Sequence, residues 1–408
     1  MSFLVEHPSS KINHSFNISG SKSESNRLLI LKYIFKNIKI ENLSNSDDTI
    51  VLKNYLESNS NLIDVHHAGT AMRFLTAYLA IQNNNSFQIT GSKRMQNRPI
   101  KILVDALNIL GADINYLDKI GYPPLKINGK MLLGGEISLS SDVSSQYISA
   151  LMLIASSLKN GLVITLEGSV TSRPYIEMTS SILNRVGIKS LFKENKISIQ
   201  SVKLLEKSIQ KVESDWSSLS YFYSIVALSK NSELNIGSYN INSIQGDKKL
   251  VEIYQNFGVQ TSFLNDIITI KKTESKDLNK SLKLDLSDTP DIAQTIAVTC
   301  FGLGLSCDLH GLHTLKIKET DRLEALKVEL TKMGAIVSIT KDSFHLTKSS
   351  EIKSNITIET YNDHRMAMAF TPLAIFKPII INNPDVVSKS FPDFWDHLKG
   401  MNFLISKN

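Results

Sequence analysis

The 408-residue chain is poor in cysteine and has no long apolar run. Its two cysteines, Cys300 and Cys307, lie in or beside the apolar residues 292–309, so we expect buried thiols rather than a disulfide or a metal site. No apolar stretch approaches the roughly 18 residues of a membrane-spanning helix, and the N-terminus lacks a basic segment followed by an apolar one. The sequence therefore predicts a cytoplasmic protein with no membrane partner.

Arginine is also scarce, because eight of the 45 basic residues are arginines and the other 37 are lysines. A guanidinium group can grip carboxylate or phosphate through two parallel hydrogen bonds, which an ammonium group cannot reproduce. Seven of the arginines lie in the motifs described below, and Arg185 lies outside them. No stripe of basic residues alternating with aromatics is visible, so the pattern indicates a small, multiply anionic ligand rather than nucleic acid.

Length and repetition predict two globular domains, since 408 residues exceed what one hydrophobic core usually supports. Four stretches share one pattern, in which a helix ends at a glycine and two strands follow. They are residues 106–116, 180–200, 251–270 and 324–346, with Gly111, Gly187, Gly258 and Gly334 spaced by 76, 71 and 76 residues. Residues 48–66 and 394–405 are candidate degenerate copies. Six units predict an α/β fold of two similar lobes with three repeats each.

The stretch Gly-Ser-Lys-Ser-Glu-Ser-Asn-Arg at residues 20–27 predicts an anion site at the start of a helix. Free N–H groups and the dipole of a helix N-terminus attract phosphate or carboxylate, and Lys22 adds a positive charge. Ser21 and Glu24 have the spacing of a capping box. The phosphate loop of ATPases does not fit, because it needs glycines where Ser21 and Phe16 stand. An ordinary well-capped helix is the alternative.

Further motifs place charged or hydroxyl side chains at the starts of expected helices. Arg94 and Arg98 precede a helix that we expect to begin near Pro99. Capping explains the serines and aspartates at other helix starts when each is taken alone. The run Asp-His-Arg at residues 363–365 is different, because three ionisable groups before a strongly apolar helix are costly unless they are paired or bind a ligand. The other motifs lie at residues 68–73, 142–147, 171–175, 288–293, 316–323 and 389–395.

Together the motifs resemble the 5-enolpyruvylshikimate-3-phosphate synthase family, in the family's order and over nearly the whole chain. The resemblance rests on Gly-Ser-Lys-Ser-x-Ser-Asn-Arg at 20–27, Ala-Gly-Thr-Ala-Met-Arg at 68–73, Arg-Met-x-x-Arg-Pro-Ile at 94–100, Ser-Ser-Gln at 144–146, Lys-Glu-Thr-Asp-Arg-Leu at 318–323, Tyr-Asn-Asp-His-Arg-Met-Ala-Met at 361–368 and Ser-Phe-Pro-Asp at 390–393. It implies a two-lobed inside-out α/β barrel in which each lobe has three βαβαββ repeats. Lobe I would comprise residues 1–20 and 213–408 and lobe II residues 21–212, with the active site in the cleft between them.

The resemblance also implies a reaction, the transfer of the enolpyruvyl group of phosphoenolpyruvate to the 5-hydroxyl of shikimate 3-phosphate, with release of phosphate from a tetrahedral intermediate. Asp291 would take the hydroxyl proton, while Glu319 and Lys22 would serve the methylene and the leaving phosphate, although the sequence leaves the division of these roles open. The implied phosphoenolpyruvate contacts are Lys22, Gly69, Arg98, Gln146, Arg322, Arg365 and Lys389. The implied shikimate 3-phosphate contacts are Lys22, Ser23, Arg27, Ser144, Ser145, Gln146, Ser172, Tyr175, Asp291 and Lys318. No metal or organic cofactor is called for, and we expect a monomer.

Two rival functions stay open at this point. The sister enzymes that transfer enolpyruvate to UDP-N-acetylglucosamine use a loop cysteine as an acid, and residues 93–99 contain none. A catalytically inactive anion-binding regulatory protein on the same scaffold would be expected to have lost Lys22, Asp291 or Glu319, and the chain has all three.

Three positions depart from the family's usual pattern. His67 and Thr314 stand where the family usually has asparagine, and Phe74 stands where it usually has proline. None of them removes an essential charge. They leave open how the phosphoenolpyruvate pocket is packed, how shikimate 3-phosphate is held, and how sensitive the protein is to bulky mimics of phosphoenolpyruvate.

Overall fold

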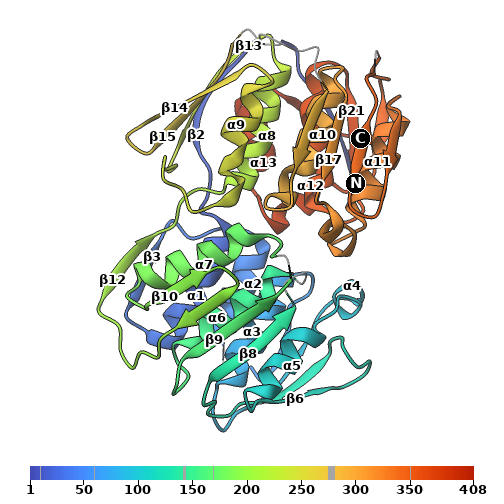
Figure 1. Cartoon of the computed structure of the whole chain (residues 1–408). Helices are drawn as coiled ribbons and strands as arrows, with labels where there is room; N and C mark the ends of the chain where they lie inside the picture. The colour runs from blue at the N-terminus through green and yellow to red at the C-terminus, as the bar shows by residue number, and fades with distance from the viewer. Residues whose placement is uncertain (10, 59, 141–143, 169, 274–280, 350) are drawn as a thin grey trace. The chain divides into compact units, whose positions relative to one another are not determined.

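The computed structural model describes residues 1–9, 11–58, 60–140, 144–168, 170–273, 281–349 and 351–408 (Figure 1). Residues 142 and 143, which open one of the predicted motifs, lie outside this described part. The chain divides into two compact units, which we call unit 1 (Met1–Ser19 with Glu213–Asn408) and unit 2 (Gly20–Val212). Each unit has its own sheets.

The described residues of unit 2 form two four-stranded sheets with the same topology. Their strand orders are β4 (Leu62–Asp64), β5 (Ser86–Thr90), β7 (Leu125–Asn128), β6 (Asp113–Tyr116), and β8 (Gly135–Ser140), β9 (Leu162–Glu167), β11 (Lys196–Ile199), β10 (Ser190–Lys193). In each sheet the first two strands are parallel, and a hairpin pairs antiparallel with the second strand. A third, two-stranded sheet pairs β3 (Ile38–Glu41) with β12 (Ser208–Lys211) in parallel. The helices are α1 (Lys22–Phe35), α2 (Asp47–Glu57), α3 (Gly69–Ala80), α4 (Lys93–Gln96), α5 (Lys101–Ile109), α6 (Ser145–Ala155) and α7 (Arg173–Arg185).

In unit 1, the residues that the structure describes repeat this topology in three four-stranded sheets. Their strand orders are β2 (Lys11–Asn17), β13 (Asn231–Gly237), β15 (Ile267–Lys272), β14 (Val259–Leu264); β16 (Leu282–Asp285), β17 (Cys307–His310), β19 (Phe344–Leu346), β18 (Val337–Ile339); and β20 (Ile356–Ile358), β21 (Ile379–Asn382), β1 (Ser2–Glu6), β22 (Leu404–Lys407). In the last sheet, β1 from the start of the chain takes the place of the hairpin's second strand. The helices are α8 (Trp216–Leu228), α9 (Leu250–Gln255), α10 (Ala293–Gly302), α11 (Arg322–Lys332), α12 (His364–Phe370) and α13 (Phe394–Gly400).

The predicted helix–glycine–strand–strand repeat is confirmed. Gly111, Gly187, Gly258 and Gly334 have φ values of 99°, 93°, 71° and 104°, a left-handed conformation that ends a helix without a Cβ clash. The degenerate copy at residues 48–66 is wrong in part, because α2 forms but β4 joins the next sheet. The sheet of β3 and β12 therefore has only two strands among the described residues. The α/β class with two similar units is confirmed.

The cores of both units are built around apolar helices. Every residue of α8 except Ser217 is buried, and Arg73 is one of the eleven buried residues of α3. A helix that is buried on all sides needs apolar residues all round, whereas the strands alternate, as in β13, where every second side chain is buried. Cys300 and Cys307 are buried free thiols, as predicted. No helix within the described ranges is both long and apolar enough to cross a bilayer.

Two predicted helix starts need correction. Ser21 is the N-cap residue of α1, but the predicted capping box is wrong. The buried Ser21 hydroxyl makes no hydrogen bond to any described residue, and the fully buried Glu24 carboxylate lies 3.3 Å from Nη2 of Arg185. The helix expected near Pro99 begins at Lys101, since the N–H of Ile100 donates to the carbonyl of Gly121 at 2.9 Å. The α1 helix therefore begins where it was predicted but without the capping box, whereas α5 begins later than predicted, after a tertiary hydrogen bond at Ile100.

Candidate active site

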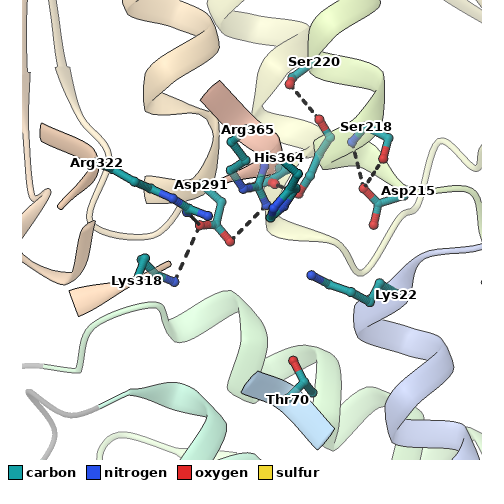
Figure 2. A network of polar contacts seen from close by, with 12 residues as sticks. Lys22, Thr70, Asp215, Ser218, Ser220, Asp291, Lys318, Arg322, His364 and Arg365 are labelled. Atoms are coloured by element: carbon teal, nitrogen blue, oxygen red, sulfur yellow. Dashed lines mark hydrogen bonds and ion pairs between the residues drawn. The ribbon is translucent and has the colours of Figure 1, made fainter. Parts of the chain in front are cut away.

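A dense group of charges in unit 1 centres on Arg322, the first residue of α11. Its side chain is 2% exposed and donates from all three nitrogens. Nε bonds Oδ2 of Asp363 at 2.7 Å, Nη1 bonds Oδ1 of Asp291 at 3.0 Å, and Nη2 bonds Oε2 of Glu319 at 2.8 Å. Figure 2 shows Arg322 and Asp291 facing each other. One guanidinium thus holds three carboxylates from three separate segments of the chain.

Three further cations complete this group, which we call the Arg322 network. Nζ of Lys318 lies 3.6 Å from Oδ1 of Asp291, and Nη2 of Arg365 lies 3.3 Å from Oδ2 of the same carboxylate (Figure 2). Nζ of Lys389 lies 2.8 Å from Oε1 of Glu319. The network therefore contains four cations and three carboxylates and has a formal charge of +1. All seven of its residues lie in motifs that the sequence singled out, namely Asp291, Lys318, Glu319, Arg322, Asp363, Arg365 and Lys389.

Local capping explains why Arg322 and Arg365 lie where they do. The carboxylate of Asp321 accepts hydrogen bonds from the N–H groups of Leu323 and Glu324 at 3.1 and 3.2 Å, so α11 begins at Arg322. In the same way, Oδ1 of Asp363 accepts the N–H of Arg365 at 2.9 Å and starts α12. Asp363 therefore caps one helix and binds the first residue of another.

Burial and charge act in opposite directions on Arg322. Burial alone would lower the pKa of its guanidinium, but the nearby carboxylates of Asp363, Glu319 and Asp291 outweigh burial and raise the pKa above its ordinary value. Arg322 is therefore permanently charged, and its position is tied to the three carboxylates.

Asp247 adds a fourth carboxyl group to this part of unit 1. It lies in the 3-10 helix Gly246–Lys249, is 5% exposed and accepts a hydrogen bond from the hydroxyl of Ser217. Burial, together with the charge of Asp291, raises the pKa of Asp247 to about 6, while Arg365 acts in the opposite direction. Asp247 therefore titrates closer to neutrality than an ordinary aspartate.

In unit 2, Lys22 and Ser23 open α1 as predicted. Nζ of Lys22 lies 3.6 Å from Oδ2 of Asp48, whose side chain is 3% exposed in the first turn of α2. A buried carboxylate needs a partner, and Lys22 supplies one. The side chain of Lys22 itself is 19% exposed, so part of the ammonium-bearing chain reaches the surface of unit 2.

The start of α3 brings together three residues of the implied phosphoenolpyruvate set. A Cβ added at Gly69 would lie 2.6 Å from Nη1 of Arg98, so only glycine lets this guanidinium lie against the helix. Nε2 of Gln146 donates to the hydroxyl of Thr70 at 3.4 Å, which links α6 to the same turn. Arg98 and Gln146 therefore both contact the first turn of α3, which Gly69 opens.

Arg27 is held by neutral groups, in contrast to Arg322. Nε donates to the hydroxyl of Thr179 at 2.7 Å, and Nη2 donates to the hydroxyl of Ser149 at 2.9 Å. The carbonyls of Ser23 and Tyr175 accept from Nη1 at 2.8 Å and Nη2 at 3.3 Å. Burial lowers the pKa of Arg27 to about 10, against the opposing effects of Tyr175 and Glu24. Ser23, Arg27 and Tyr175 of the implied shikimate 3-phosphate set are thus joined.

The serines of the implied shikimate 3-phosphate set lie at the starts of α6 and α7. Ser144 is the N-cap residue of α6, where its hydroxyl accepts the N–H of Gln146 at 3.4 Å, so capping does occur there. Ser145 is the first residue of α6 and is buried. Ser172 precedes α7 in a left-handed conformation with φ of 53°, and its hydroxyl makes no capping bond to the described residues.

The sequence did not identify several partners that the structure shows. Asp48 is one of two aspartates in the first turn of α2, where an aspartate ordinarily needs no explanation beyond favourable interaction with the helix N-terminus. Its contact with Lys22 arises only from the tertiary fold. Arg73 lies in a predicted motif but binds the carbonyls of Gly69 and Pro99 at 3.2 and 3.1 Å, so it fixes the chain before α5. Phe74 lies under Arg27, with the guanidinium carbon 5.5 Å from the ring centroid.

Within the described part of the chain, no group of three or more His, Cys, Asp or Glu side chains is arranged to hold a metal ion.

The fold is similar to that of proteins with solved structures. A solved structure of EPSP synthase from Acinetobacter baumannii matches with a TM-score of 0.78 at 22% identity and covers all of both chains. At this identity the match shows the fold alone, a two-domain α/β architecture.

Sequence comparison identifies the family. The EPSP synthase family model, described as 3-phosphoshikimate 1-carboxyvinyltransferase, matches residues 34–398. A 3-phosphoshikimate 1-carboxyvinyltransferase of Bacteroides fragilis is 43% identical over 411 residues and covers 99% of this chain and 98% of the relative. One from Colwellia psychrerythraea is 35% identical over 428 residues, covering 98% and 99%. The chain belongs to the EPSP synthase family, which confirms the resemblance seen in the sequence.

Proposed function

We propose that this protein transfers the enolpyruvyl group of phosphoenolpyruvate to the 5-hydroxyl of shikimate 3-phosphate and releases inorganic phosphate. The Arg322 network carries the proposal, because it gathers the two implied proton-transfer carboxylates with four cations. The two substrates together bear two phosphates and two carboxylates, which cationic side chains bind well. This reaction would place the protein in the shikimate pathway of aromatic amino acid biosynthesis.

The reaction needs two proton movements at carbon and one at oxygen. The 5-hydroxyl oxygen adds to the central carbon of the enol, giving up its proton, while the methylene carbon gains a proton and becomes a methyl group. The resulting tetrahedral intermediate then loses a proton from the methyl group, and the bond between its central carbon and the phosphate oxygen breaks. This restores the double bond and frees phosphate. Asp291 would accept the hydroxyl proton, and Glu319 and Lys22 would serve the methyl group and the leaving phosphate.

The geometry of Glu319 suits a group that must move a proton at a fixed place. Its carboxylate oxygens bind charged partners, Oε2 with Arg322 at 2.8 Å and Oε1 with Lys389 at 2.8 Å. Held in this way, the carboxylate loses little freedom when a substrate binds. The same cations, with Arg365, would bind the phosphate and carboxylate of phosphoenolpyruvate, and Gly69, Arg98 and Gln146 would contribute from α3 and its neighbours.

We also infer that substrates are bound by residues of both units. The implied shikimate 3-phosphate contacts include Ser23 and Ser172 of unit 2, and Asp291 and Lys318 of unit 1. If shikimate 3-phosphate must satisfy both sets, its binding should lower the radius of gyration in small-angle scattering and raise the affinity for phosphoenolpyruvate. Unchanged scattering, together with phosphoenolpyruvate binding that ignores the first substrate, would contradict this inference.

Phosphate release tests the proposed function directly. Purified protein is incubated with phosphoenolpyruvate and one of three additions, namely shikimate 3-phosphate, UDP-N-acetylglucosamine or buffer, without added metal. Of the three samples, we expect phosphate release only in the one that contains shikimate 3-phosphate. Release that occurs with UDP-N-acetylglucosamine instead would favour the sister reaction, and no release with either would leave an anion-binding role. We further propose a cytoplasmic monomer, which light scattering at the mass of one chain would test.

A further inference from the structure

Two residues before Asp363 have an unusual backbone conformation. Tyr361 and Asn362 have φ values of 53° and 55°, so two consecutive non-glycine residues lie in the left-handed region. This conformation is energetically costly for L-residues with a side chain. Asparagine adopts it more readily because its short polar side chain can hydrogen-bond to the nearby backbone, which the tyrosine side chain cannot do. Such a turn persists only where the surrounding structure holds it.

Glu329 of α11 holds one end of this turn. It is fully buried, and its Oε1 accepts the hydroxyl of Tyr361 at 2.6 Å. Its Oε2 accepts the N–H of Glu359 at 3.2 Å, just before the turn. Nζ of Lys332 lies 2.8 Å from both oxygens and compensates the buried charge. The Glu329 carboxylate is therefore fixed, and it fixes the chain on the near side of the turn.

Arg322 of the same helix holds the other end. Its guanidinium binds the carboxylate of Asp363, the residue directly after the turn, at 2.7 Å. Arg322 and Glu329 are seven residues apart, which places them on one face of α11, two helical turns from each other. The strained turn is thus held between two points of one rigid helix.

We propose that Glu329 and Tyr361 are positioning residues for the Arg322 network. The hydrogen bond from the Tyr361 hydroxyl to Glu329 keeps residues 361–362 in the left-handed conformation. That conformation presents Asp363 to Arg322 and starts α12 so that Arg365 reaches Asp291. The inference deepens the proposed function and rests on it for a readout, because phosphoenolpyruvate affinity would report where the two arginines lie.

The strain gives the proposal a distinctive consequence. Without the hydroxyl tether, the turn can relax toward ordinary backbone conformations, and Asp363 moves with it. A glycine at position 362 would adopt the left-handed conformation at little cost and would reduce this tendency to relax. The side-chain bond that Asn383 makes to Oδ1 of Asn362, at 3.0 Å, would be lost in that change.

The test compares three variants in the presence of saturating shikimate 3-phosphate. Tyr361→Phe removes only the hydroxyl, and we expect the KM for phosphoenolpyruvate to rise about tenfold or more with kcat changed less, because binding by the arginines weakens. The matched control is Tyr223→Phe, which removes a hydroxyl bonded to Thr261 at 2.8 Å elsewhere in unit 1 and should leave that KM unchanged. The double variant Tyr361→Phe with Asn362→Gly should recover part of the lost affinity.

The outcomes separate this inference from the proposed function. If the wild-type protein releases no phosphate from the two substrates, the proposed function fails. If the wild-type protein is active and Tyr361→Phe has the same KM, or if Tyr223→Phe raises it equally, the positioning role is wrong. If Asn362→Gly restores no affinity in the Tyr361→Phe background, strain at residue 362 plays no part in the effect. A raised KM with partial rescue supports the proposal.

Discussion

Arg322 in unit 1 and Arg27 in unit 2 are both buried, but among opposite kinds of partner. In unit 1, Arg322 is surrounded by three carboxylates, which raise its pKa although it is buried. In unit 2, Arg27 is bound by hydroxyls and carbonyls, and burial lowers its pKa to about 10. Arg73 follows the second pattern, with two carbonyl partners. The first arrangement neutralises most of the charge that it buries, whereas the second leaves positive charge to attract an anion.

This difference suggests a division of labour. The two carboxylates proposed to move protons, Asp291 and Glu319, are held in place by cations of the Arg322 network. Hydroxyls, helix starts and arginines with neutral partners suit the binding of a phosphate, because they do not compete with it through their own negative charges. Four predictions can break or sharpen the comparison.

The largest effect is expected from Glu319→Gln. The amide keeps the volume and can still bond Arg322, but it cannot carry a proton, so kcat should fall by roughly 10²–10⁴ while substrate binding largely persists. The matched control is Glu324→Gln, which changes an exposed glutamate of α11 paired with Lys327 at 3.4 Å and should leave kcat unaltered. Normal turnover in Glu319→Gln would make this residue a structural partner of Arg322 only.

The next effect concerns stability and compares the two arginines directly. Arg322→Met leaves three carboxylates without their shared cation, and we expect the free energy of unfolding to fall by about 3–5 kcal/mol. Arg27→Met leaves only neutral acceptors, whose loss of hydrogen bonds should cost less, about 1–3 kcal/mol. Urea unfolding of both variants measures the difference. Equal losses would show that the carboxylates do not distinguish the two sites.

A smaller effect is expected at the first turn of α3. Gly69→Ala would place a methyl group against Arg98, so the guanidinium must move. The KM for phosphoenolpyruvate should rise about 10- to 100-fold, which corresponds to the loss of a hydrogen bond to a charged group. The affinity for shikimate 3-phosphate serves as the internal control and should change little. An unchanged KM would mean that Arg98 does not contact phosphoenolpyruvate.

The smallest effect depends on pH and involves Asp247. Its pKa of about 6 in the folded protein exceeds the ordinary value of 3.8, so the folded state binds this proton more tightly. The resulting stabilisation is present at pH 4 and is lost as the pH rises through 6. Asp247→Asn should therefore come close to the wild-type stability at pH 4 and exceed it by about 2 kcal/mol at pH 8. Urea unfolding at both pH values is the measurement, and a difference that does not change with pH would refute the assignment.

Local chemistry made much of the fold and of the site predictable. The glycines of the repeat, such as Gly334, could be predicted because the residue after a helix often has a left-handed backbone conformation, which favours glycine. Arg322 and Glu319 could be predicted as site residues because the charged motif at residues 318–323 matches a motif of the family. The bond between Arg322 and Asp363 was not predictable, because the two residues are 41 positions apart and meet only through packing.

Competition between local and tertiary bonds explains the errors. Ser21 and Glu24 satisfy the spacing of a capping box, but Glu24 pairs with Arg185 across 161 residues instead. Pro99 is a suitable first helical residue, yet its carbonyl binds Arg73 and the helix begins two residues later. Spacing rules describe what a segment can do alone, and the packed partners decide which option is used.

Deuterium incorporation is the most direct test of the central claim, that the protein performs an addition–elimination on phosphoenolpyruvate in which a proton is added to and removed from the methylene carbon. The reaction is run in D₂O with shikimate 3-phosphate, and the enolpyruvyl product is analysed by mass spectrometry and proton NMR. The account predicts deuterium in the methylene group of the product, because the methyl group of the intermediate can lose either isotope. Product formed at the normal rate without deuterium at that carbon would contradict it.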